Sequence, residues 1–286
     1  MENGTNNYLR YHPIIASLVV VGLYYAFLIG AIFVIQLIGM MLGLTIFDVD
    51  PGVSAILETI ITFAILSILF FIIIPFVLRY PKEVESFDDY LDTIRLSRTS
   101  PLKSHIFIGV IISAIIILPT FLFALPTGLW YLDFAVRQIF PPHSWSLITA
   151  IIPGFFEEVA FRGILLTIIA NRYIEKKAIV GSSFVFGFAH AINYLFGADP
   201  IITTAQIGFA FFLGILFAYL FFETDSLLPV IIIHYLIGAF GQFFAYAIYA
   251  WPIDPLLKVI YMVICLGAIP MLLGLGFMKL YKKFFA

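Results

Sequence analysis

Two adjacent glutamates and an arginine, Glu157, Glu158 and Arg162, interrupt a long apolar stretch of the sequence. An ionisable group near the middle of a bilayer costs roughly 2.5–3.5 kcal/mol, so such groups usually face a functional site inside the protein. On a helix, Glu158 and Arg162 share a face and are predicted to pair. Glu157 then points about 100° away and keeps a free carboxylate suited to general-base chemistry. The alternative is a buried ion-pair network that only fixes helix packing.

Two histidines, His190 and His234, also lie within apolar stretches. Each alone is typical of a hydrogen-bonded packing residue. Together with Glu157, however, two imidazoles around a polar cavity can activate a water molecule, either directly or through a metal ion. At about 1.5 Å rise per residue, Glu157 lies roughly 22 Å from the cytoplasmic end of its helix, His190 roughly 20 Å and His234 roughly 10 Å. Tilted or kinked helices are therefore needed to bring the three into one layer.

Transmembrane helices are the elements expected to position these side chains. The chain has 286 residues, of which 63% are hydrophobic and 11% charged, whereas a soluble domain carries about 25% charged residues. A helical span needs about 20 apolar residues, and backbone groups in lipid must be hydrogen-bonded internally. Apolar stretches of this kind occur at 13–45, 53–79, 104–131, 145–171, 178–197, 203–222, 227–249 and 256–280. The sequence thus predicts an all-α polytopic membrane bundle of about eight helices, with an active site in the bundle core.

The distribution of basic residues predicts the orientation. Of the 15 Lys and Arg residues, twelve fall on one side of these spans, Arg137 and Lys258 fall on the other, and Arg162 lies within the membrane. Because cytoplasmic segments are enriched in Lys and Arg, both termini are predicted to be cytoplasmic in a multi-pass protein of the cell membrane. The formal net charge of −2 argues against a nucleic-acid partner, and membrane lipid is the expected surrounding.

Three regions are predicted along the chain. Residues 1–130 are N-terminal transmembrane helices with an amphipathic cytoplasmic loop, 131–250 a catalytic core, and 251–286 a C-terminal transmembrane helix. Acidic, basic and apolar residues alternate in the loop at 80–103 at loosely helical spacing, which predicts an amphipathic helix lying on the membrane.

Three motifs occur in a fixed order: Glu-Glu-x-x-x-Arg at 157–162, Phe-x-x-x-His at 186–190, and the late histidine His234. In this order they resemble the CPBP family of intramembrane proteases, also called the ABI family, which includes type II CAAX prenyl endopeptidases and lysostaphin resistance protein A-like proteins. The resemblance covers about 145–245. It implies an endopeptidase that cleaves a membrane-anchored or lipidated protein or peptide.

The resemblance also implies a role for each of the predicted catalytic residues. Glu157 would be the general base that activates water, and His190 would help to hold that water. Glu158 and Arg162 would shape the site through their pairing. His234 would stabilise the oxyanion of the tetrahedral intermediate, a contribution typically worth about 2.7–4 kcal/mol.

Metal dependence stays open at this point. Glu157, His190 and His234 also look like zinc ligands, and the family is often described as metalloproteases. The sequence lacks the His-Glu-x-x-His zinc helix, so a mechanism without a cofactor is favoured, with zinc as the alternative.

One position departs from the family pattern. Gly238 stands four residues after His234, where the family usually has an asparagine. If that asparagine supplies half of the oxyanion hole, Asn193 or Gln242 could act as the oxyanion or substrate-binding donor instead. Alternatively, Gly238 is a packing residue in a degraded site. In that case the chain is a non-proteolytic membrane scaffold or bacteriocin-immunity member of the family. A proton-coupled transporter that uses the same carboxylates as a relay is a further alternative.

Overall fold

An all-α helix bundle is the observed architecture. The structure, a computed structural model, describes residues 12–41, 43, 51–79, 81, 84–127, 146–241 and 251–285, and these residues form helices and turns with no strand. Five stretches within them are long and apolar enough to cross a membrane: Pro13–Met41, Gly52–Val77, Leu102–Phe123, Pro200–Thr224 and Pro255–Phe284. The predicted fold class, a polytopic membrane bundle, is confirmed.

The predicted number of eight crossings is not confirmed. The remaining three predicted spans are also helical, over Ser146–Ala170, Glu175–Tyr194 and Leu228–Gly241. The first of these three contains three ionisable residues, Glu157, Glu158 and Arg162, and the last is a shorter apolar helix over Leu228–Phe240. Length and composition therefore identify five spans directly, while the other three contain the residues of chemical interest.

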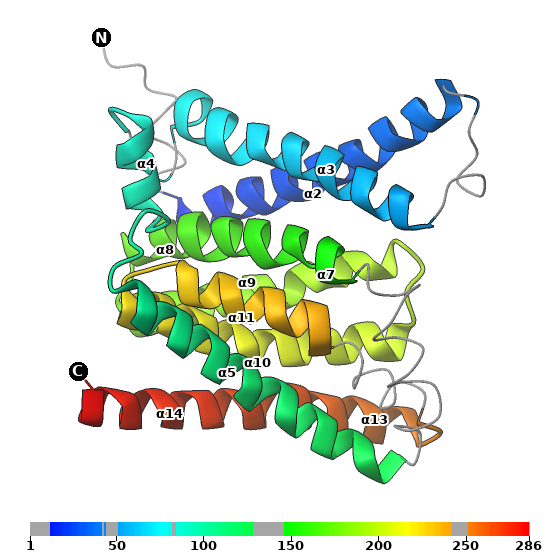
Figure 1. The fold of residues 1–286 in the computed structure, drawn as a ribbon, viewed down its shortest axis with the longest axis vertical. Coiled ribbons are helices and arrows are strands. Elements are labelled where there is room, and N and C mark those ends of the chain that lie inside the picture. The colour runs from blue at the N-terminus through cyan, green and yellow to red at the C-terminus, as the bar shows by residue number, and fades with distance from the viewer. Residues whose placement is uncertain are drawn as a thin grey trace.

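The helices lie side by side in layers (Figure 1). One end of the stack is formed by α2 and by α3 with its π-helical continuation η1, and the other by α13, η7 and α14. Between them lie α7 to α11, and α5 packs against α11 and α14. The bounds are α2 Pro13–Met41, α3 Pro51–Ile68, η1 Leu69–Val77, α5 Leu102–Ala124, α7 Ser146–Thr149, α8 Thr167–Ala170, α9 Glu175–Ala189, η5 His190–Tyr194, α10 Pro200–Thr224, α11 Leu228–Leu236, η6 Ile237–Gly241, α13 Pro255–Met262, η7 Val263–Ala268 and α14 Ile269–Phe285.

Local sequence explains where two of these helices begin. Asp199 caps α10 by accepting hydrogen bonds from the backbone N–H groups of Ile201 and Ile202, each at 2.9 Å. Asp254 caps α13 in the same way. Each cap is followed by a proline at the first helical position, where its missing N–H and fixed φ are favourable. These caps set the helix starts independently of the lipid.

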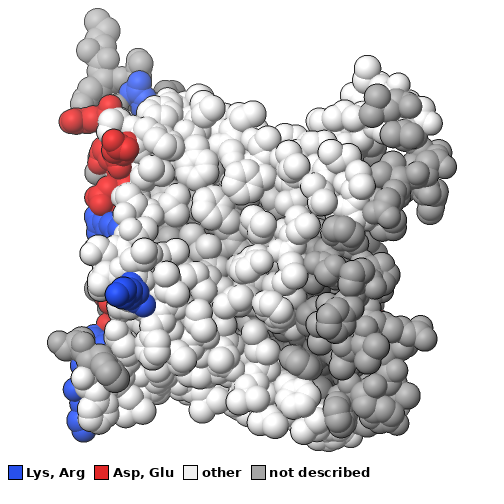
Figure 2. All heavy atoms as spheres, viewed as in Figure 1, with Lys and Arg blue, Asp and Glu red and all other residues white. Residues whose placement is uncertain are grey.

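Charged side chains gather along one edge of the visible face (Figure 2), where α4 (Phe87–Thr93) and the C-terminal end of α14 lie. The middle of that face shows no Lys, Arg, Asp or Glu among the described residues. An uncharged belt with a charged edge is the surface expected of a protein that sits in a bilayer. The predicted cytoplasmic location of this edge remains a prediction.

The predicted amphipathic helix is present as α4, and part of its apolar side packs against the protein, while Phe87 is 44% exposed. Tyr90 and Ile94 are fully buried in the main hydrophobic core, and the Tyr90 hydroxyl donates to the carbonyl of Phe70 at 2.7 Å. Arg95 forms an ion pair with Asp225 at 3.0 Å. The segment therefore closes the charged end of the bundle, because the core offers its apolar residues a closer-packed partner than lipid headgroups do.

Candidate active site

The two glutamates lie on a helix with widened turns. It runs through α7 (Ser146–Thr149), η3 (Pro153–Glu157), η4 (Val159–Leu166) and α8 (Thr167–Ala170), and both η segments are π-helical. Pro153 begins η3, and a proline inside a helix removes one backbone donor and disturbs the regular ladder. π-Helical turns are rare and frequently occur at functional sites.

Glu158 is completely buried and accepts two hydrogen bonds on the same oxygen. Its Oε1 lies 2.9 Å from Nη1 of Arg162 and 2.6 Å from Nδ1 of His234. The predicted pairing of Glu158 with Arg162 is therefore confirmed. An ionised carboxylate only accepts hydrogen bonds, so the proton of His234 lies on Nδ1, and a neutral His234 has a lone pair on Nε2.

The Arg162 guanidinium lies among aromatic rings. Its side chain is 2% exposed, and its Cζ lies 4.0 Å from the centroid of the Phe186 ring and 5.0 Å from that of Phe217. Cation–π contacts of this kind stabilise a desolvated cation. Within the described part of the chain, however, Arg162 Nη2 and Glu158 Oε2 are buried without a hydrogen-bond partner. Because an unsatisfied buried polar atom costs about 1–3 kcal/mol, stabilisation of the fold alone does not account for the Glu158–Arg162 pair.

Glu157 differs from its neighbour in having no arginine partner in the described residues. Its Oε2 lies 3.8 Å from Nε2 of His234, beyond hydrogen-bond distance, and the two side chains are 16% and 14% exposed. The ion pair thus neutralises Glu158 and leaves Glu157 as the accessible carboxylate. This is the division of charge that the helical spacing predicts.

His190 begins η5, directly after α9. Its Nδ1 lies 3.0 Å from the carbonyl oxygen of Phe186, one turn earlier. A carbonyl only accepts, so Nδ1 carries the proton and Nε2 of the neutral ring is available as an acceptor. The Phe186 ring joins His190 to the other residues: its centroid lies 5.1 Å from that of His190, 6.1 Å from that of His234 and 4.0 Å from Cζ of Arg162. The structure therefore brings all five predicted catalytic residues into one cluster.

Of the two predicted substitute oxyanion donors, the structure describes only Asn193. The side-chain amide of Asn193 donates to Oε1 of Gln206 at 2.9 Å, and Gln242 lies outside the described residues. A Cβ added at Gly238 would lie 3.3 Å from the Cβ of Ala150, the residue that follows α7, so this glycine lies where η6 packs against the end of α7. The interpretation of Gly238 as a packing residue fits this position.

A second glycine controls how closely α11 approaches the glutamates. A Cβ at Gly154 would lie 2.8 Å from Cα and 2.9 Å from N of Tyr235, the neighbour of His234. Because those are backbone atoms, a side chain at position 154 could be accommodated only if one of the two helices shifted. Small residues permit such close helix contacts in membranes. Gly154 is therefore the residue that allows His234 to reach Glu158.

We expect Gly154→Ala to lower the activity of the protein at least tenfold, because one methyl group forces α11 away and lengthens the 2.6 Å contact between His234 and Glu158. The stability cost should be about 1–3 kcal/mol, as for other overpacked contacts, measured by thermal unfolding in detergent. Gly181→Ala is the matched control, since a Cβ there meets nothing within 4 Å. An active Gly154→Ala variant would contradict this role.

The sequence leaves zinc binding by Glu157, His190 and His234 open. Within the described residues, no three His, Cys, Asp or Glu side chains are grouped so that they could hold a metal ion. Nδ1 of His234 is bound to Glu158, and Nδ1 of His190 to a backbone carbonyl, which leaves the Nε2 atom of each ring open.

Sequence reasoning missed the contribution of α2. The hydroxyl of Tyr24 donates to Oε1 of Glu157 at 3.5 Å, and that of Tyr25 donates to the carbonyl of Ala189 at 3.0 Å, next to His190. Two adjacent tyrosines in the middle of an apolar span were the available signal, because a buried tyrosine hydroxyl usually has a hydrogen-bond partner. The N-terminal helix therefore belongs to the site.

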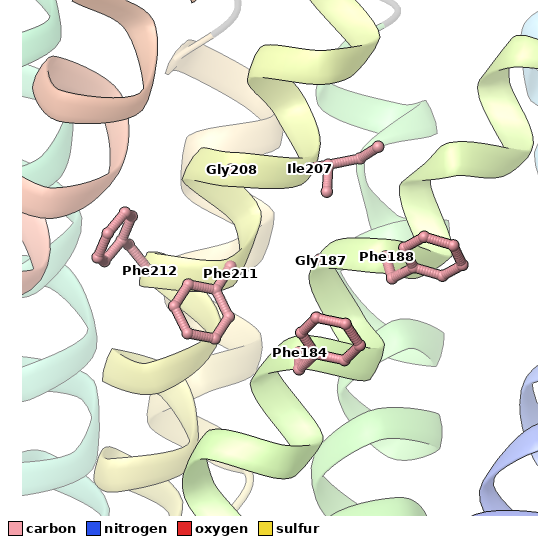
Figure 3. A pocket seen from close by; sticks show the side chains of 7 residues that line it. All are labelled: Phe184, Gly187, Phe188, Ile207, Gly208, Phe211 and Phe212. Carbon is pink, nitrogen blue, oxygen red and sulfur yellow. The ribbon is translucent and has the colours of Figure 1, made fainter. Parts of the chain in front are cut away.

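An apolar groove of about 330 Å³ lies between α9 and α10 (Figure 3). It is lined by Phe184, Gly187, Phe188, Ile207, Gly208, Phe211 and Phe212. The Phe184 and Phe188 rings stack at its edge and are 63% and 62% exposed. None of the five predicted catalytic residues lines this groove, which opens on the outer, apolar surface of the bundle.

Comparison with known proteins gives one match. Residues 138–240 match the family model described as type II CAAX prenyl endopeptidase Rce1-like. No curated protein and no solved structure matches the chain significantly. The matched segment includes all five predicted catalytic residues and excludes α2.

Proposed function

We propose that the chain, whose residues 138–240 match the type II CAAX prenyl endopeptidase Rce1-like family, is an intramembrane endopeptidase. Its substrate would be a lipidated or membrane-anchored protein, cleaved close to the anchor. The observation that carries the proposal is the unequal pair of carboxylates. Glu158 is buried in an ion pair, while Glu157 stays accessible beside two histidines.

Glu157 acts first, as a general base. It removes a proton from a water molecule, whose oxygen attacks the carbonyl carbon of the scissile bond. His190 accepts a hydrogen bond from that water at Nε2, the nitrogen left free by its contact with the Phe186 carbonyl. Proton transfer by a positioned side chain contributes typically about 10²–10⁴-fold to the rate.

His234 acts on the tetrahedral intermediate. Glu158 holds the Nδ1–H of His234 and stabilises the imidazolium form, which can donate from Nε2 to the oxyanion. When the intermediate collapses, the carbon–nitrogen bond breaks and Glu157 returns its proton to the leaving amine. The carboxylate is thereby restored for the next cycle, and one water is consumed for each bond cleaved.

Purified protein in lipid vesicles should cleave members of a panel of lipidated and transmembrane peptides. Mass spectrometry of the products should place the cut near the anchor, with one oxygen from labelled water in the new carboxyl group. Binding of the panel without any cleavage would instead favour the scaffold function, which the replacement of the family asparagine by Gly238 supports. Proton flux across sealed vesicles without cleavage would favour the transporter.

Chelators are expected to leave the cleavage rate unchanged. No grouping of metal ligands is present in the described residues, and the proposed base and oxyanion donor are protein side chains. Cleavage should be followed after dialysis against strong chelators and again after zinc is added back. Loss of activity that zinc restores would overturn the metal-free mechanism.

A further inference from the structure

The Tyr24 hydroxyl of α2 contacts the proposed base from outside the family segment. Tyr24 is 2% exposed, and its hydroxyl donates to Oε1 of Glu157 at 3.5 Å. Residues 138–240 carry the family match, so the match assigns no role to this helix. The contact therefore adds a group to the site that the three motifs do not contain.

The two carboxylate oxygens of Glu157 have different neighbours. Oε1 accepts from Tyr24, whereas Oε2 lies 3.8 Å from Nε2 of His234. A carboxylate that is bound at one oxygen has a restricted rotation, and its other oxygen is then directed to a defined place. In this geometry Oε2 is the oxygen that lies on the side of the histidine.

Close packing restrains the Tyr24 ring. It packs against the rings of Tyr25 at 5.1 Å and Phe70 at 6.1 Å between centroids, within the main hydrophobic core. Densely packed interiors allow few alternative rotamers. Tyr25 ties the same turn of α2 to the carbonyl of Ala189, at the start of the His190 segment. The position of α2 is thus fixed relative to both Glu157 and His190.

We propose that Tyr24 is a positioning residue for the base: its hydroxyl fixes Oε1 of Glu157, so that Oε2 takes the proton from water. The inference rests on the proposed function, because it assigns Glu157 the role of base. Tyr24 itself touches neither substrate nor water in this scheme. It acts only by holding the carboxylate in its productive orientation.

Tyr24→Phe keeps the ring and removes the hydroxyl. We expect kcat to fall about tenfold, as for the loss of one hydrogen bond to a charged group, while KM and the thermal unfolding midpoint stay close to wild type. Tyr261→Phe is the matched control. Tyr261 lies in α13, and the substitution removes a hydroxyl that donates to the carbonyl of Phe123 at 2.6 Å. That variant should retain the wild-type kcat.

Infrared spectroscopy provides a second readout that does not depend on turnover. The carboxylate bands that disappear in Glu157→Gln should shift in Tyr24→Phe and stay in place in Tyr261→Phe. An unchanged band and an unchanged kcat in Tyr24→Phe, with Glu157→Gln inactive, would overturn the role of Tyr24 and leave the proposed function standing. A Glu157→Gln variant that cleaves as wild type does would overturn the proposed function itself.

Discussion

Glu158→Gln is expected to destabilise the protein by about 3–5 kcal/mol, the usual result of breaking a buried ion pair on one side. The substitution keeps the shape of the side chain but leaves Arg162, which is 2% exposed, as an uncompensated buried cation. It also weakens the 2.6 Å contact that holds Nδ1 of His234. Thermal unfolding in detergent measures the first effect, and peptide cleavage should fall at least a hundredfold.

A double variant separates the two effects of Glu158. In Glu158→Leu/Arg162→Met both charges are absent, and replacing a whole buried pair by apolar residues is often neutral or stabilising. Thermal stability should therefore return toward wild type, while cleavage stays lost because His234 has no acceptor at Nδ1. Recovery of cleavage in the double variant would show that the pair serves packing alone.

The charge arrangement was predictable because it depends on local spacing. Four residues separate Glu158 from Arg162, and that pairing follows from helix geometry whichever helices surround it. That Glu157 has no arginine partner among the described residues follows in turn, since one arginine cannot neutralise both neighbours. Periodicity and composition likewise predicted the helical fold, because lipid leaves the backbone few other choices.

Contacts between distant helices were not predictable from one sequence. Nothing local indicates that Tyr24 reaches Glu157 across 133 positions, or that Gly154 fits against the backbone of Tyr235. The hydrogen bond from Asn193 to Gln206 depends equally on how η5 packs against α10. The apolar residues of α4 were expected at the membrane surface, because their spacing alone cannot distinguish a lipid interface from a protein core.

The central claim is that Glu157 is the base, and Glu157→Gln tests it most directly. The amide cannot accept a proton from water, so kcat should fall by about 10²–10⁴-fold. Glu157 takes no part in the buried ion pair, so the thermal unfolding midpoint should change little. Glu58→Gln is the matched control. Glu58 lies at an exposed position of α3 and accepts a hydrogen bond from the Ser54 hydroxyl at 2.8 Å.

The measurement is the single-turnover rate of one membrane-anchored peptide in identical vesicles with wild type, Glu157→Gln and Glu58→Gln. The account predicts cleavage by wild type and Glu58→Gln, and almost none by a folded Glu157→Gln protein. Cleavage by Glu157→Gln at the wild-type rate would contradict it.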